Sequence, residues 1–139
     1  MNALEMSNTG YLLLLHSGDW WKDLGREELE KAIAQNHAWL GQLMASGKVK
    51  AGQSLARTGA MVSGKNGRSV TDGPFAEAKE VVGGYLLLDV ATLEEAVEMA
   101  KGCPCLALGG KVEVRPLTDT CPSSARLEEL KREEELTTA

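Results

Sequence analysis

The order of apolar and polar positions predicts that the chain begins with a strand and continues with a helix. Every position from Tyr11 to Leu15 is apolar, which is typical of a strand buried on both faces. From Glu27 to Ser46 apolar side chains recur at helical spacing on one arc, at Leu29, Ala32, Ile33, Leu40, Leu43 and Met44. Gly47 follows as an ordinary C-terminal cap, so we expect the helix to end there.

The middle of the chain predicts further strands and a tight hairpin. A strand over residues 49–55 precedes a second one over residues 60–63. The segment Gly64-Lys65-Asn66-Gly67 contains Asn-Gly, the strongest short-range hairpin signal. Residues 68–71 should therefore return antiparallel to residues 60–63.

The second half repeats the pattern of the first. Gly83-Gly84 opens a strand over residues 85–90, and Thr92 with Glu95 forms a capping box at the start of a helix that ends at Gly102. Residues 111–115 alternate as a last strand, which Pro116 stops.

This order of elements predicts an α+β fold of the ferredoxin-like βαββαβ type with an extra hairpin. We expect one domain over residues 10–117, preceded by a flexible leader over residues 1–9. We expect residues 118–139 to form a C-terminal tail that is partly helical, over residues 125–136, and that is either frayed or packed on a partner subunit.

The apolar first strand also predicts a homodimer. Both helices cover one face of the sheet, yet the strand is apolar on both faces, so a second copy should cover the other face. The two sheets would enclose a barrel-like cavity for a small-molecule ligand. Because Glu113 and Arg115 alternate with Val112 and Val114, we expect these two charged side chains to line that cavity.

Composition excludes several classes of protein. The 139 residues are 43% hydrophobic, 25% charged and 4% aromatic, with a net charge of -5. The acidic balance and the scarcity of aromatic residues argue against nucleic-acid binding. The longest apolar run is far shorter than the roughly 20 residues of a membrane helix. We find no secretory signal and expect a cytoplasmic protein that binds neither nucleic acid nor membrane.

The cysteines predict neither a disulfide framework nor a metal site. Cys103 and Cys105 form a C-x-C pair after the second helix, and Cys121 follows near the tail. No Cys and His residues have the spacing of a zinc site, and no Rossmann or P-loop pattern indicates a nucleotide. We therefore expect reduced cysteines, no metal and no cofactor.

Three residues are candidates for acid–base catalysis. His16 ends the first strand, where side chains would surround the mouth of a cavity, and His37 lies at the edge of the apolar arc of the first helix. Asp72 makes a turn with Gly73 and Pro74 and could also hold a ligand or accept a proton. Each of the three also has a purely structural explanation: a strand end, a solvent-facing helix flank and a turn.

The candidates for ligand binding are Trp20, Phe75 and Tyr85, together with Glu113 and Arg115. Trp20 and Trp21 follow Gly18-Asp19, and exposed indoles at this place would cover either the mouth of a cavity or a partner chain. Phe75 is the sole phenylalanine, and we expect it to pack a loop over the dimer seam.

A set of motifs resembles the DGPF branch of the YCII-related (YciI-like) family. The most specific is Val70-Thr71-Asp72-Gly73-Pro74-Phe75-Ala76-Glu77. Others are Gly18-Asp19-Trp20, Val62-Ser63-Gly64-Lys65-Asn66-Gly67, Gly83-Gly84-Tyr85 and Val112-Glu113-Val114-Arg115-Pro116. The likeness covers residues 11–117.

The resemblance implies a dimeric α+β barrel of ferredoxin-like protomers. Some members accompany extracytoplasmic-function sigma factors, and some carry a His-Asp pair proposed as catalytic. The histidine of that pair lies on the first helix, where Asn36 is the better match and His37 is one position away. Cys103 stands before Pro104 where those relatives have the aspartate, so the resemblance does not carry the pair over to this chain.

Two functional hypotheses follow. The first is a dimeric small-molecule-binding protein that could act as a cofactor-free acid–base enzyme of the lyase, isomerase or hydrolase class. The alternative is a non-catalytic regulatory or accessory module associated with a sigma factor. The sequence leaves open whether the protein is an enzyme.

Overall fold

The computed structural model describes residues 10–73 and 82–138. Its strands are β1 (Tyr11–His16), β2 (Val49–Ser54), β3 (Ala60–Ser63), β4 (Ser69–Asp72), β5 (Val82–Leu88) and β6 (Lys111–Pro116). Its helices are α1 (Arg26–Ala45), α2 (Leu93–Lys101) and α3 (Pro122–Thr138), with short 3₁₀ helices η1 (Lys65–Gly67) and η2 (Pro104–Leu108).

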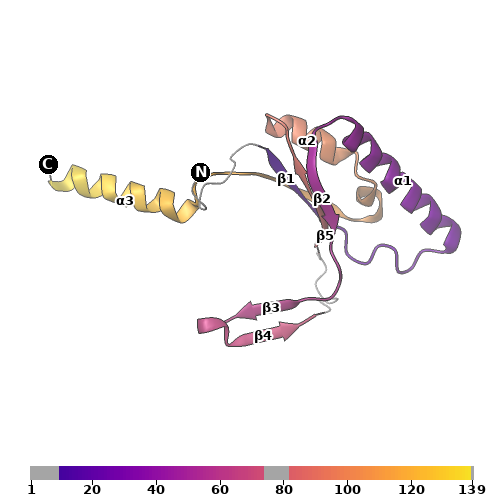
Figure 1. Cartoon of the computed structure of the whole chain (residues 1–139), viewed down its shortest axis with the longest axis horizontal. Coiled ribbons are helices and arrows are strands. Elements are labelled where there is room, and N and C mark those ends of the chain that lie inside the picture. Colours follow the sequence, from indigo (N-terminus) through magenta and orange to yellow (C-terminus); the bar gives the residue numbers. More distant parts are fainter. Residues whose placement is uncertain (1–9, 74–81, 139) are drawn as a thin grey trace.

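The main sheet has the predicted ferredoxin-like topology. Its strand order is β2-β5-β1-β6, and the pairs β1–β5, β1–β6 and β2–β5 are all antiparallel. Helices α1 and α2 lie together on one side of this sheet (Figure 1). The predicted α+β class is therefore confirmed.

The core fills the space between the sheet and the two helices. Leu13 of β1 and Leu88 of β5 are fully buried. Around them lie further buried residues from β5, from the helices and from the adjoining segments: Leu86, Trp39, Leu43, Val90, Ala96, Ala100 and Cys103. Side chains of β1 that alternate with this set, at Leu12 and Leu14, lie on the opposite face, which we call the open face.

Helix α1 has the predicted extent but contacts the core with a different set of residues. Ile33 is 42% exposed and Met44 is 64% exposed, whereas Trp39 is only 6% exposed. The Trp39 indole Nε1 donates to the Met99 carbonyl at the end of α2, at 3.2 Å. This bulky side chain joins the two helices. Ile33 and Met44 therefore lie at the border of the surface that α1 buries against the core.

The predicted cap of α2 is present in part. The Thr92 hydroxyl Oγ1 accepts from the Glu95 backbone N–H at 3.2 Å, as a capping box requires. The Glu95 carboxylate forms an ion pair with Lys48, which follows the end of α1. The second helix is thereby connected to the start of β2.

The hairpin of β3 and β4 is a separate two-stranded sheet that projects from the body (Figure 1). Its turn is the predicted Asn-Gly, with Asn66 at φ 60° and Gly67 at φ 68°. Every residue of both strands is exposed. No other described element covers the hairpin.

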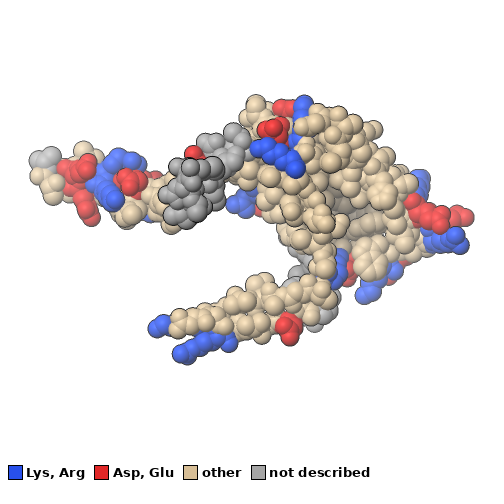
Figure 2. Space-filling view, in the orientation of Figure 1, with Lys and Arg blue, Asp and Glu red and all other residues tan. Residues whose placement is uncertain are grey.

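Helix α3 begins at Pro122, three residues before the predicted start, because proline fits the first turn of a helix. It has no buried residue, extends away from the sheet, and carries charged side chains of both signs along its length (Figures 1 and 2). The predicted leader, residues 1–9, lies outside the described residues. Among the described helices, none is both long enough and apolar enough to cross a membrane.

We expect Leu13→Ala to lower the free energy of unfolding by about 2–5 kcal/mol, because it removes a fully buried side chain from the centre of the sheet. Leu127→Ala on α3 is the control, since Leu127 is 51% exposed, and its effect should stay within about 0.5 kcal/mol. Urea unfolding followed by circular dichroism measures both. Equal effects of the two substitutions would contradict the assignment of the core.

Candidate functional site

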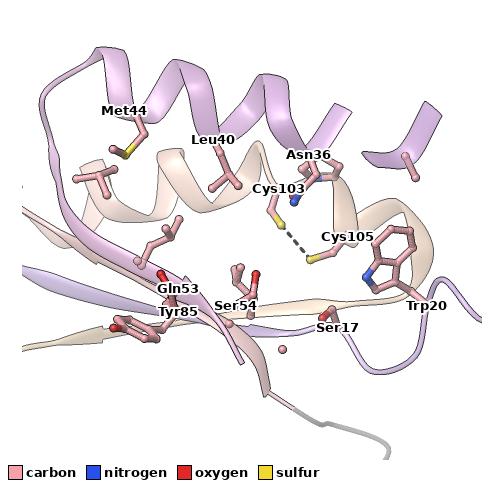
Figure 3. Close-up of a pocket in the computed structure, with 18 of the residues that line it drawn as sticks. Ser17, Trp20, Asn36, Leu40, Met44, Gln53, Ser54, Tyr85, Cys103 and Cys105 are labelled. Atoms are coloured by element: carbon pink, nitrogen blue, oxygen red, sulfur yellow. Dashed lines mark hydrogen bonds between the residues drawn. The ribbon is translucent and has the colours of Figure 1, made fainter. Parts of the chain in front are cut away.

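The chain encloses a cavity of about 470 Å³ between α1 and the half of the sheet formed by β2 and β5 (Figure 3). From α1 it is lined by Asn36, Leu40 and Met44, whose side chains point toward the sheet. Its remaining wall comes from the segment after β1, from η2 and from β2 and β5, with Ser17, Trp20, Gln53, Ser54, Leu86, Cys103, Cys105 and Leu108 among its residues. The volume is that of a small-molecule site.

Three glycines on the sheet side of this cavity, at positions 52, 83 and 84, lie where a larger residue would meet its neighbours. A Cβ atom at Gly52 would lie 2.5 Å from the Leu86 side chain, and one at Gly83 would lie 2.5 Å from the Ser17 hydroxyl. A Cβ atom at Gly84 would lie 3.0 Å from the Gln53 carbonyl oxygen of β2. The strands therefore approach one another closely here and leave space beneath α1.

Trp20 is held at the cavity by an ion pair between its neighbour and the segment after β2. Arg57 Nη2 lies 2.5 Å from Asp19 Oδ1 and also donates to the Gly18 carbonyl. Both charged side chains are half-buried, at 28% and 30% exposed. Trp20 lines the cavity, whereas Trp21 is 45% exposed.

A second group of polar residues lies on the open face of the sheet. His16 Nε2 is 2.8 Å from Glu113 Oε1, and Arg115 Nη1 donates to Glu113 Oε2 at 3.0 Å. The register of β1 with β6 accounts for this contact, because Leu14 pairs with Glu113 and His16 with Lys111. Glu113 and Arg115 thus lie on the face opposite Val112 and Val114, as their alternation predicted.

These contacts favour the ionised form of Glu113. Its pKa is held below the ordinary value, first by the hydrogen bond from His16 and then by the one from Arg115. With a carboxylate as partner, His16 Nε2 is the donating nitrogen, which makes Nδ1 the proton-accepting nitrogen of the neutral ring. The His16 side chain is largely buried on this face, at 17% exposed.

The other predicted catalytic residues lie apart in the fold. His37 is exposed on α1, and its neighbour Asn36 faces the cavity instead. Asp72 is exposed at the end of β4, paired with Ala60 in the hairpin sheet. The structure therefore unites His16 with Glu113 and Arg115, and it places His37 and Asp72 on other elements.

Among the predicted ligand-binding residues, Trp20 lines the cavity beneath α1. Tyr85 also contributes to its wall, although its pairing with Leu14 and Gln53 places its side chain on the open face. Phe75 lies outside the described residues. Within the described ranges, no three His, Cys, Asp or Glu side chains are grouped as a metal site would require.

Sequence reasoning missed two features of these sites. It treated the C-x-C pair as ordinary cysteines, whereas both thiols lie at the cavity wall. It also did not pair His16 with Glu113. The alternation of β6 indicated the face on which Glu113 lies, and the register that brings it beside His16 came only with the structure.

We expect His16→Leu to raise the pKa of Glu113 toward its ordinary value near 4.5, and Arg115→Leu to raise it less, because His16 makes the larger contribution. An NMR titration of the Glu113 carboxyl carbon measures both. Because folding lowers this pKa, ionised Glu113 stabilises the folded protein at every pH above the ordinary pKa of the carboxyl group. This contribution is lost as pH falls through the lowered pKa. An unchanged pKa in His16→Leu would show that the hydrogen bond does not form in solution.

Comparison with known proteins agrees with this fold. An uncharacterised protein of Rhizobium meliloti (strain 1021) is 33% identical to the chain over 96 residues, which cover 66% of this chain and 77% of that protein. The model of the YCII-related domain matches residues 11–120, from the first residue of β1 to just past the end of β6. The chain therefore belongs to the YCII-related domain family.

Proposed function

We propose that the protein is a homodimeric acid–base enzyme for a small molecule, with His16 as the proton-transferring group. The observation that carries this proposal is the 2.8 Å contact between His16 Nε2 and Glu113 Oε1. A carboxylate that accepts from one imidazole nitrogen fixes the tautomer and the orientation of the ring, which is the arrangement that a general base requires.

The charges beside His16 indicate the class of substrate. Arg115 is 66% exposed while it contacts Glu113, so its guanidinium can also meet an anionic group on the open face. A small carboxylate with an acidic C–H bond next to a carbonyl suits this arrangement. Arg115 would hold the carboxylate, and His16 Nδ1 would remove the proton.

A second copy of the chain would enclose this group. The open face carries the half-buried side chains of Leu12, Leu14 and Leu87 at its centre. The hairpin projects beside it with Met61, Val62 and Val70 about 60% exposed. Apolar surface of this kind is typical of an interface, and packing two open faces together would bury it.

We expect a mass near twice 14.9 kDa for the protein in solution. Multi-angle light scattering after size exclusion at low micromolar concentration measures it. Leu14→Glu, which puts a charge into the proposed interface, should give the single-chain mass, and Leu136→Glu on the exposed end of α3 should leave the dimer intact. A wild-type protein that elutes with the mass of one chain would rule out the dimer.

We also expect the protein to catalyse deuterium exchange into a small 2-oxo acid. Pyruvate and oxaloacetate in D₂O, followed by proton NMR, are the probes. His16→Leu should slow the catalysed exchange by roughly 100-fold or more, the usual contribution of a general base. Arg115→Leu should weaken binding of both acids.

His37→Leu is the matched control for this experiment, because His37 is the other histidine of the chain and is exposed on α1. It should leave the exchange rate unchanged. Exchange at the buffer rate with a protein that is folded and dimeric would reject proton abstraction from these acids and would favour a binding role. Equal losses in the two histidine variants would reject His16 as the base.

A further inference from the structure

Two thiols face each other in the wall of the cavity beneath α1. Cys103 Sγ lies 3.0 Å from Cys105 Sγ, and Figure 3 shows the two sulfur atoms pointing toward one another. Cys103 is 4% exposed, and Cys105 is half-buried. Both residues line the cavity, which is on the other side of the sheet from His16.

The backbone fixes this pair in place. The Cys103 N–H donates to the Ala100 carbonyl at 3.0 Å, and the Gly110 N–H donates to the Cys105 carbonyl at 2.9 Å. Pro104 between the two cysteines begins η2 and has a fixed φ. A Cβ atom at Gly110 would lie 3.1 Å from Cys105 Sγ, so the absence of a side chain there leaves room for the thiol.

The contact between the thiols distinguishes them chemically. The Cys105 S–H donates to the Cys103 sulfur, which lowers the pKa of Cys103 to about 7 even though burial opposes this shift. The pKa of Cys105 is raised, because its proton is engaged by Cys103 and a second negative charge would lie beside the first. Cys103 is therefore the thiol of the pair that ionises near neutral pH, and Cys105 keeps its proton.

The lining of the cavity favours an apolar small molecule as the reactant of the Cys103 thiolate. Its wall contains Leu40, Met44, Leu86 and Leu108, and its polar groups are neutral hydroxyls and amides such as Ser54 and Asn36. An anionic or highly charged molecule would lose its hydration without a counter-charge in this space. A neutral molecule with an apolar body and one reactive polar group fits.

We propose that Cys103 and Cys105 form a dithiol site that reduces an apolar organic hydroperoxide in this cavity. The inference is independent of the acid–base function proposed for the open face, since it uses other residues on the opposite side of the sheet.

The reaction balances with the two thiols as the reductant. The Cys103 thiolate attacks the terminal oxygen of the hydroperoxide, the O–O bond breaks, and the alkoxide takes the Cys105 proton and leaves as an alcohol. Cys105, now a thiolate, attacks the sulfur of the Cys103 sulfenic acid, and hydroxide leaves and becomes water with a solvent proton. One hydroperoxide and two thiols thus give one alcohol, one water and one disulfide. A soluble dithiol such as dithiothreitol returns the disulfide to thiols.

The test uses the full chain and one equivalent of cumene hydroperoxide, followed by intact-mass spectrometry and peptide mapping. We expect the mass to fall by two hydrogen atoms through a disulfide between Cys103 and Cys105, and dithiothreitol to reverse the loss. In Cys105→Ser the reaction should stop at a sulfenic acid on Cys103, which dimedone traps. Cys103→Ser should form no disulfide within the chain.

Cys121 is the control, because it is an exposed cysteine away from the cavity. Cys121→Ser should react as the wild type does. The hydrogen bond with Ser123 also lowers the pKa of Cys121. In wild-type protein, Cys103 should still react with cumene hydroperoxide at least about tenfold faster than Cys121 does, because the cavity holds the hydroperoxide beside Cys103.

Three results would overturn the proposal. They are equal rates at Cys103 and Cys121, added oxygen on the wild type with no disulfide, and disulfides that join separate chains instead of Cys103 and Cys105. The comparison of rates within wild-type protein does not depend on how well the variants fold.

Discussion

The central constraint on this fold is that strand β1 needs burial on both of its faces. Leu13 meets the helices and is fully buried, whereas Leu12 and Leu14 lie on the open face, which no described helix covers. The strand is also paired on both edges, with β5 and with β6. Each candidate site is therefore positioned by β1, because Leu15 lies at the cavity and His16 beside Glu113.

The sheet separates two kinds of chemistry that neighbouring residues of one strand would otherwise bring together. Successive side chains of β1 point to opposite faces, so Leu15 and His16 serve different sites. The open face holds ions that contact one another near water, whereas the cavity beneath α1 holds thiols in an apolar wall. The two groups of polar side chains are thus kept apart within a single small domain.

Local patterns predicted most elements of the fold, and long-range packing explains what they missed. The Asn66-Gly67 turn and the Thr92 cap depend on neighbouring residues, and both were found from the sequence. Trp39 was not, because its burial depends on a contact with Met99 that is 60 residues away. The helical arc therefore included Ile33, which the structure leaves exposed at the border of α1.

In the candidate sites, too, local patterns were predicted from the sequence and long-range contacts were not. The alternation of β6 placed Glu113 and Arg115 on the open face, since period two is a local property. That Glu113 contacts His16 depends on the register between two strands 97 positions apart in the chain. The dithiol also needed the structure, because a C-x-C spacing alone does not show whether both thiols point to the same side.

The projecting hairpin has a consequence for how the molecule is held together. A lone two-stranded ribbon is marginally stable in water, and every residue of β3 and β4 is exposed. A surface that covered the hairpin would therefore stabilise it. If a second copy supplies that surface, the opening of the ribbon obeys mass action, and its local stability rises with protein concentration while that of the core around Leu13 and Leu88 does not.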